Sequence, residues 1–165
     1  MISIWLTPSE EDWDYLQEII NDLAAEYSAP VFSPHCTLLS PVDLNKKELQ
    51  SVLSNVSKEI APIYVTMSGL NYSNNIWKTV FIKLEKSSEL IALQKRVVGQ
   101  SSPVQPYEFL PHLSLIYKEM TVELKEEIIR KLVVRNLYKM DKITAMRTRL
   151  DVTKWEKVAE VTLHA

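Results

Sequence analysis

The sequence predicts an α+β protein made of two similar halves, and three observations lead to that prediction. Helix-like and strand-like segments alternate along the 165 residues, of which 46% are hydrophobic, enough to fill a core. One short sequence motif occurs twice, 77 residues apart, which is close to half of the chain. No low-complexity segment or long linker interrupts the chain, so we expect residues 1–165 to form a single domain of two interleaved lobes.

The first half opens with the pattern of a strand followed by a helix. Residues 2–7 are rich in apolar side chains and end before a proline, which suits a strand. Ser9 lies three residues before Asp12, which is the spacing of a capping box. Apolar side chains then recur every three or four residues over 13–27, as they do on one face of a helix.

The rest of the first half follows the same signals. Residues 35–39 suit a short strand, and Asn45 with Glu48 repeats the capping-box spacing at the start of a second amphipathic helix. Two strand patterns separated by a turn-rich segment then predict a hairpin, with strands at residues 63–68 and 77–84.

The second half repeats this order. Ser87 and Thr121 stand where each can cap a further helix, and residues 112–117 between these helices suit a strand. Residues 136–150 and 157–164 are expected to form a closing hairpin. The predicted order is therefore β-α-β-α-β-β-α-β-α-β-β.

Composition excludes several classes of protein. A formal net charge of −2 gives no overall basic surface for nucleic acid, and no apolar run approaches the roughly 18 residues that span a membrane. The isolated Gly69 and Gly99 exclude the dinucleotide fingerprint and the P-loop. The single Cys36 excludes a disulfide framework and a cysteine-rich zinc site, and we expect it to be a small buried residue. The N-terminus lacks a signal-peptide pattern, so we expect a cytoplasmic protein.

The repeated motif contains the candidate catalytic residues. Its two copies are Pro-His-Cys-Thr-Leu-Leu at residues 34–39 and Pro-His-Leu-Ser-Leu-Ile at residues 111–116. Because residues i and i+2 of a strand point to the same face, His35 would project beside Thr37. In the same way, His112 would project beside Ser114. If the halves face each other, two imidazoles and two hydroxyls line one cleft.

Such a cleft suits hydrolysis of a phosphodiester. Two imidazoles can divide the acid and base roles near neutral pH, and two hydroxyls can donate hydrogen bonds to phosphoryl oxygens. Water could then attack the phosphorus while the leaving oxygen is protonated, with no metal required. His164 lies next to the C-terminus without a comparable context, and we expect it at the surface.

On these motifs the chain resembles the 2H phosphoesterases, a family named for two His-x-Thr/Ser motifs. Four segments are similar to its cyclic phosphodiesterase branch in plants and yeast: residues 3–6, 32–38, 111–117 and 155–159. The resemblance implies two pseudo-symmetric lobes, each an antiparallel sheet with outer helices, around a central cleft. It also implies hydrolysis of ADP-ribose 1″,2″-cyclic phosphate to ADP-ribose 1″-phosphate, with nucleoside 2′,3′-cyclic phosphates opened to 2′-phosphates as a related class.

The resemblance also assigns roles to the four motif residues. His112 would activate water, and His35 would protonate the departing 2-oxygen. Thr37 and Ser114 would hold the non-bridging oxygens. The near symmetry of the halves leaves open which histidine is the acid and which is the base.

Three aromatic residues are further candidates for substrate contacts. Tyr117 would reach the cleft only if its strand ends or bulges first, since its odd offset from the histidine points to the opposite face. Trp77 could stack on an adenine ring and Trp5 could form a wall of the cleft, with core packing as the alternative for both. Trp155 is expected to be a packing residue.

We therefore expect a monomeric cyclic phosphodiesterase that needs neither metal nor cofactor and acts on a small nucleotide cyclic phosphate. Membranes and long nucleic acids are not expected partners. Neither motif is followed by the Arg or Lys of the RNA-ligase-like branch, which counts against a long RNA substrate. The alternatives are an RNA 2′,3′-cyclic phosphodiesterase or 2′-5′ RNA-ligase-like enzyme, and a nucleotide-binding module without catalysis.

Overall fold

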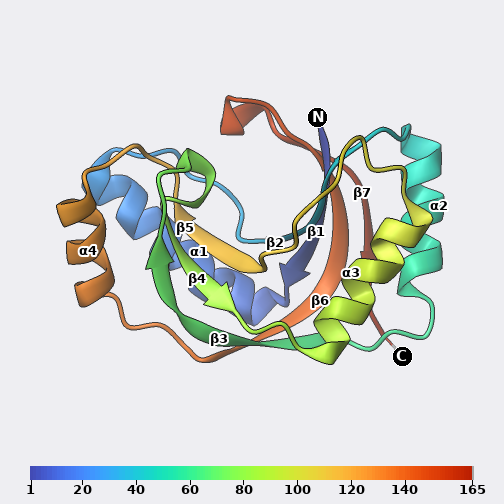
Figure 1. Ribbon diagram of the computed structural model, residues 1–165, viewed down its shortest axis with the longest axis horizontal. Helices are drawn as coiled ribbons and strands as arrows, with labels where there is room; N and C mark the ends of the chain where they lie inside the picture. The colour runs from blue at the N-terminus through green and yellow to red at the C-terminus, as the bar shows by residue number, and fades with distance from the viewer. Residues whose placement is uncertain (165) are drawn as a thin grey trace.

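The computed structural model describes residues 1–164, and its elements follow the predicted order (Figure 1). The strands are β1 (Ile2–Pro8), β2 (Cys36–Val42), β3 (Ile63–Tyr72), β4 (Val80–Leu84), β5 (His112–Ile116), β6 (Leu137–Arg147) and β7 (Glu156–Thr162). The α-helices are α1 (Glu10–Tyr27), α2 (Lys46–Ser57), α3 (Ser88–Gln100) and α4 (Val122–Lys131). Two short 3₁₀ turns, η1 (Ile76–Lys78) and η2 (Val152–Lys154), precede β4 and β7.

The strands pair antiparallel in the order β2-β1-β6-β3-β4-β5, with β7 also paired to β6. Strand β6 pairs with β1 on one side. On its other side it pairs with β3 over residues 137–140 and with β7 over residues 142–147. The first part of β3 therefore joins β6, whereas its later part pairs with β4. These two long strands link the lobe of β2, β1, β6 and β7 to the lobe of β3, β4 and β5.

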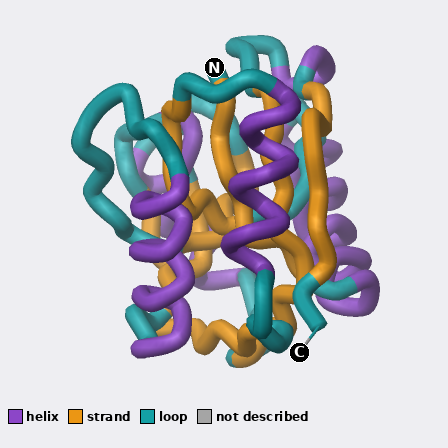
Figure 2. The backbone as a smooth tube through the Cα atoms, turned by 90° about the vertical axis from the view of Figure 1, so that its right-hand side faces the viewer, coloured by secondary structure: helices purple, strands orange, loops and turns teal. Residues whose placement is uncertain are grey.

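Helices cover the outer face of each lobe (Figure 1). Helices α2 and α3 contact β7, β6 and β2 of one lobe, while α1 and α4 contact β5, β3 and β4 of the other. Figure 2, seen from the side of α2 and α3, shows these helices in front of the strands. This is the predicted α+β arrangement of two antiparallel lobes with outer helices. Within residues 1–164, no helix is both long enough and apolar enough to cross a membrane.

Most of the predicted helix caps are formed. Asn45 and Glu48 make a complete capping box, and the hydroxyls of Ser87 and Thr121 each accept a hydrogen bond from a backbone amide in the first helical turn. The capping box predicted at Ser9 is wrong, although α1 does begin there: the Ser9 side chain makes no cap hydrogen bond.

Asp12 does not complete the capping box because both of its carboxylate oxygens bond to residues near the beginning of β6. One of its oxygens accepts a hydrogen bond from Nη1 of Arg135 at 3.0 Å, and the other accepts one from the backbone amide of Lys139 at 2.7 Å. Asp12 therefore ties the first turn of α1 to the beginning of β6 instead of capping its own helix.

The strand predicted over residues 77–84 is wrong at its beginning. The Asn75 side chain accepts a hydrogen bond from the Trp77 amide at 3.0 Å, and the Thr79 hydroxyl donates one to the Ile76 carbonyl at 3.1 Å. These two bonds wind the segment into η1, so that β4 begins only at Val80. Trp77 consequently lies on the turn of the hairpin and not on a strand face.

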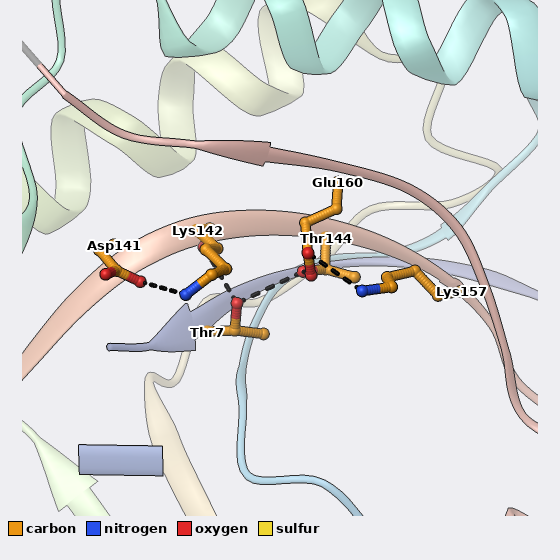
Figure 3. A network of polar contacts seen from close by, with 6 residues as sticks. All are labelled: Thr7, Asp141, Lys142, Thr144, Lys157 and Glu160. Carbon is orange, nitrogen blue, oxygen red and sulfur yellow. Dashed lines mark hydrogen bonds and ion pairs between the residues drawn. The ribbon is translucent and has the colours of Figure 1, made fainter. Parts of the chain in front are cut away.

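A polar network joins β1, β6 and β7 on one face of the sheet (Figure 3). The buried Thr144 donates a hydrogen bond to Glu160 at 3.0 Å and lies 3.3 Å from the hydroxyl of Thr7. Lys157 in turn donates to the second carboxylate oxygen of Glu160 at 3.0 Å. Each buried polar atom of this network has a partner, which avoids the penalty of leaving it unpaired.

We expect Asp12→Ala to lower the free energy of unfolding by about 2–3 kcal/mol, because it removes two hydrogen bonds to a carboxylate and leaves the Lys139 amide without a partner. Denaturant unfolding measures this loss. Asp14→Ala, on the exposed side of the same helix, is the matched control and should stay within about 0.5 kcal/mol of the wild type. Equal losses in the two variants would contradict the prediction.

Candidate active site

A cavity of about 740 Å³ is lined by residues from both halves of the chain. His35 and Thr37 line it from one half, and His112 and Ser114 from the other. His35 directly precedes β2 and His112 opens β5, the two strands that end the sheet order and lie in contact. The structure therefore brings the two motifs into one cavity, whose volume is in the range of about 300–1,000 Å³ typical of small-molecule sites.

The two imidazole rings are held in the same way. Nδ1 of His35 lies 2.7 Å from the Ser33 carbonyl, and Nδ1 of His112 lies 2.7 Å from the Leu110 carbonyl. A carbonyl oxygen can only accept, so Nδ1 must carry the proton in both rings. Each bond fixes the orientation of its ring and leaves Nε2 as the nitrogen free to exchange a proton.

The aromatic surroundings of the two rings differ. The Trp5 indole stacks on His35 with ring centroids 3.6 Å apart and planes 11° apart, and Trp155 lies edge-on to the same imidazole at 6.2 Å. His112 instead meets the edge of Phe81 at 5.3 Å. His35 is only 9% exposed, whereas His112 is half-buried. The rings are thus equivalent in hydrogen bonding and unequal in burial.

Burial sets the protonation of both rings in the empty cavity. Burial lowers the pKa of His35 from 6.5 to about 4, although its bond to the Ser33 carbonyl acts in the opposite direction. Burial also lowers the pKa of His112, and the nearby Lys78 ammonium acts in the same direction. Both imidazoles are therefore neutral at pH 7 when no anion is bound.

The two motif hydroxyls also differ in their bonding. The Ser114 hydroxyl donates its proton to the Trp77 carbonyl at 2.7 Å. Within residues 1–164, the Thr37 hydroxyl has no such bond, and its side chain is half-buried at the cavity. Thr37 can therefore donate to a ligand at once, whereas Ser114 must first turn its proton away from the carbonyl.

Tyr117 reaches the cavity because its strand both ends before it and has an irregular register. Strand β5 ends at Ile116, and its pairing with β4 shifts register between Val80 and Phe81. The Tyr117 ring stacks on Phe32 with centroids 3.6 Å apart. Burial raises the pKa of Tyr117, so its hydroxyl remains a proton donor.

Trp5 and Trp77 both line the cavity, and sequence reasoning missed a third indole there. Trp155, expected only to pack, lies 5.5 Å from Trp5 and 6.1 Å from Trp77, and its Nε1 donates to the Arg149 carbonyl at 2.7 Å. A signal was present: Trp77 and Trp155 are 78 residues apart, nearly the spacing of the two histidines. Trp77 lies within the 3₁₀ turn η1 of one hairpin, and Trp155 directly follows the 3₁₀ turn η2 of the other.

The remaining predicted placements are confirmed. Cys36 is fully buried in the main core, and His164 is exposed. The charged lining residues Lys78, Glu108 and Arg149 had no recognisable motif in the sequence. In the part of the chain that the structure describes, no group of three or more His, Cys, Asp or Glu side chains is arranged to hold a metal ion.

Comparison with known families identifies the chain. The family model described as cyclic phosphodiesterase-like protein matches residues 1–163. The chain belongs to this family. Among curated relatives, a cyclic phosphodiesterase of Arabidopsis thaliana is 23% identical over 129 residues, which cover 78% of this chain and 71% of that protein.

Solved structures of other proteins share the fold. A protein of Thermus thermophilus superposes with a TM-score of 0.65 at 15% identity, over 98% of this chain and 97% of that one. E. coli LigT in complex with 3′-AMP gives a TM-score of 0.63 at 15% identity, over 99% and 98% of the two chains. The match of the family model, and not these structures, confirms the predicted family, 2H phosphoesterase of the cyclic phosphodiesterase branch, and with it the predicted class of enzyme.

The depressed pKa of His35 predicts a specific dependence of stability on pH. Because the pKa is about 4 in the folded protein and 6.5 when exposed, the contribution of His35 is complete above pH 6.5 and is lost as the pH falls toward 4. We expect the wild type to lose roughly 3 kcal/mol more than His35→Gln between pH 7 and pH 4.

Denaturant unfolding of both proteins at the two pH values measures this difference. His164→Gln, which removes an exposed histidine, should follow the wild type. A His35→Gln variant with the same loss of stability as the wild type would show that His35 is not buried in its neutral form.

Proposed function

We propose that this cyclic phosphodiesterase hydrolyses ADP-ribose 1″,2″-cyclic phosphate to ADP-ribose 1″-phosphate, and that it opens nucleoside 2′,3′-cyclic phosphates to 2′-phosphates. One observation above all supports the proposal: two histidines with matching Nδ1 hydrogen bonds of 2.7 Å line the same cavity. Their free Nε2 atoms supply the two proton-transfer groups that hydrolysis of a phosphodiester needs.

In the proposed reaction, Nε2 of His112 takes a proton from water while the water oxygen forms a bond to phosphorus. With ADP-ribose 1″,2″-cyclic phosphate the bond from phosphorus to the 2″-oxygen breaks, and with a nucleoside 2′,3′-cyclic phosphate the bond to the 3′-oxygen breaks. Protonated Nε2 of His35 gives its proton to the departing oxygen. One water is consumed, and one imidazole gains the proton that the other loses. Proton exchange with solvent then restores both rings, and no metal ion takes part.

The hydroxyls and the substrate charge complete this scheme. Thr37 and Ser114 would donate hydrogen bonds to the non-bridging oxygens, Ser114 by turning away from the Trp77 carbonyl. A cyclic phosphate carries one negative charge, which favours a protonated imidazole nearby and opposes the effect of burial. The acid therefore gains its proton together with the substrate.

The aromatic wall of the cavity suits a nucleotide. Trp77, Trp155 and Tyr117 lie within contact distance of one another, and stacking of a base on such rings contributes roughly 1–3 kcal/mol. E. coli LigT, which shares the fold, has been solved with 3′-AMP, NADP+ and ATP. A small nucleotide substrate is consistent with both observations.

We expect His35→Ala and His112→Ala each to lower kcat by at least about 100-fold, because each removes one proton-transfer group. Turnover of ADP-ribose 1″,2″-cyclic phosphate, adenosine 2′,3′-cyclic phosphate and an oligonucleotide ending in a 2′,3′-cyclic phosphate measures both rate and preference. His164→Ala serves as the control, since His164 is exposed and does not line the cavity.

Three outcomes would contradict the proposal. Near-full turnover by either cavity variant would remove the two-histidine mechanism. Preference for the oligonucleotide would mean that the substrate is the end of an RNA chain and not a small nucleotide. Activity that EDTA abolishes and a divalent ion restores would contradict the metal-free chemistry.

The pH dependence of kcat/KM gives a separate prediction. This parameter reports the free enzyme, in which one imidazole must be protonated and the other neutral. Since the pKa of His35 is about 4 and burial lowers the pKa of His112 from its ordinary value, the maximum of the bell-shaped profile should lie on the acid side of pH 6.5. We expect kcat/KM to fall about tenfold per pH unit on the alkaline side. A profile that rises toward pH 8 would contradict the neutral state of the rings.

A further inference from the structure

The cavity is richer in positive charge than the molecule as a whole. The chain has a formal net charge of −2, yet the charged side chains that line the cavity are two cations, Lys78 and Arg149, and one carboxylate, Glu108. Neither cation takes part in an ion pair within residues 1–164. Both are therefore available to an anionic ligand.

The two cations lie on different lobes. Lys78 belongs to the turn between β3 and β4, and its ammonium lies 5.8 Å from the Phe81 ring, which also contacts His112. Its charge acts directly on His112. Lys78 is thus placed beside the reacting phosphate of the proposed function.

Arg149 belongs instead to the segment between β6 and β7. The backbone here is well fixed, because the Arg149 carbonyl accepts a hydrogen bond from Trp155 at 2.7 Å and the Thr148 amide donates one to the Met1 carbonyl at 2.8 Å. The guanidinium therefore extends from a rigid base next to the aromatic wall. Nothing in the two-histidine mechanism uses it.

We infer that Arg149 binds a second anionic group of the substrate, separate from the cyclic phosphate, and so makes the site selective for nucleotides that carry a diphosphate. A planar guanidinium can donate two parallel hydrogen bonds to phosphate oxygens, which suits it to this task. A cyclic mononucleotide has a single anionic group, which Lys78 already faces. The inference rests on the proposed function and adds the residue that distinguishes its two substrate classes.

The test compares two substrates in the full-length enzyme. With ADP-ribose 1″,2″-cyclic phosphate, Arg149→Gln should lower kcat/KM about tenfold, mainly by raising KM. This factor is the lower end of the effect of one hydrogen bond to a charged group, because the site is open to solvent. The fall should be at least about fivefold larger than with adenosine 2′,3′-cyclic phosphate. Lys78→Gln should lower kcat/KM for both substrates. Arg149→Lys should recover only part of the loss, because lysine keeps the positive charge but cannot donate two parallel hydrogen bonds.

The matched control is Arg147→Gln. Arg147 lies two residues away, pairs with Glu156 at 3.0 Å and does not line the cavity, so its substitution should leave kcat/KM unchanged for both substrates. Equal effects of Arg149→Gln on both substrates would overturn the inference and leave the proposed function standing. A wild type that opens only the cyclic mononucleotide would overturn the inference together with the ADP-ribose part of the proposed function. A wild type that opens neither substrate would overturn the proposed function as well.

Discussion

The site depends on the pairing of residues 63–66 of β3 with residues 137–140 of β6. This short stretch of backbone hydrogen bonds joins two antiparallel sheets that otherwise belong to different lobes. Because it fixes one sheet relative to the other, it brings the outermost strands β2 and β5 into contact. The histidines stand at the beginnings of these two strands, so the central pairing helps to bring residues 77 positions apart into one cavity.

Near symmetry of the halves supplies equivalent groups, and local packing then makes them unequal. Both imidazoles donate from Nδ1 to a carbonyl two residues earlier, because the repeated motif has the same local backbone arrangement in both halves. Trp5 stacks on His35, whereas His112 meets only an aromatic edge. Likewise Ser114 is engaged by the Trp77 carbonyl. Two rings in different environments can hold different protonation states at one pH. Burial by itself disfavours the protonated form of His35, so its proposed role as the acid depends on the charge of the substrate.

Local signals in the sequence predicted what depends on neighbouring residues. The capping box at Asn45 was confirmed because both of its hydrogen bonds lie within four residues. The box at Ser9 failed because Asp12 finds partners more than 120 positions away, which no local pattern encodes. For the same reason the sequence located the histidine motifs but not Trp155, whose place at the cavity depends on the packing of one hairpin turn against the other.

In the proposed mechanism, burial of the histidines opposes the protonated state that the acid needs. The stacked indole of Trp5 holds the ring of His35 in place, while the overall burial of that ring disfavours its protonated form. An acid that is neutral when the cavity is empty cannot donate a proton from that state. The negative charge of a bound cyclic phosphate acts against the desolvation and favours proton uptake as the substrate enters. Under the proposed mechanism, the negative charge of the substrate therefore supplies the condition that lets His35 act as an acid.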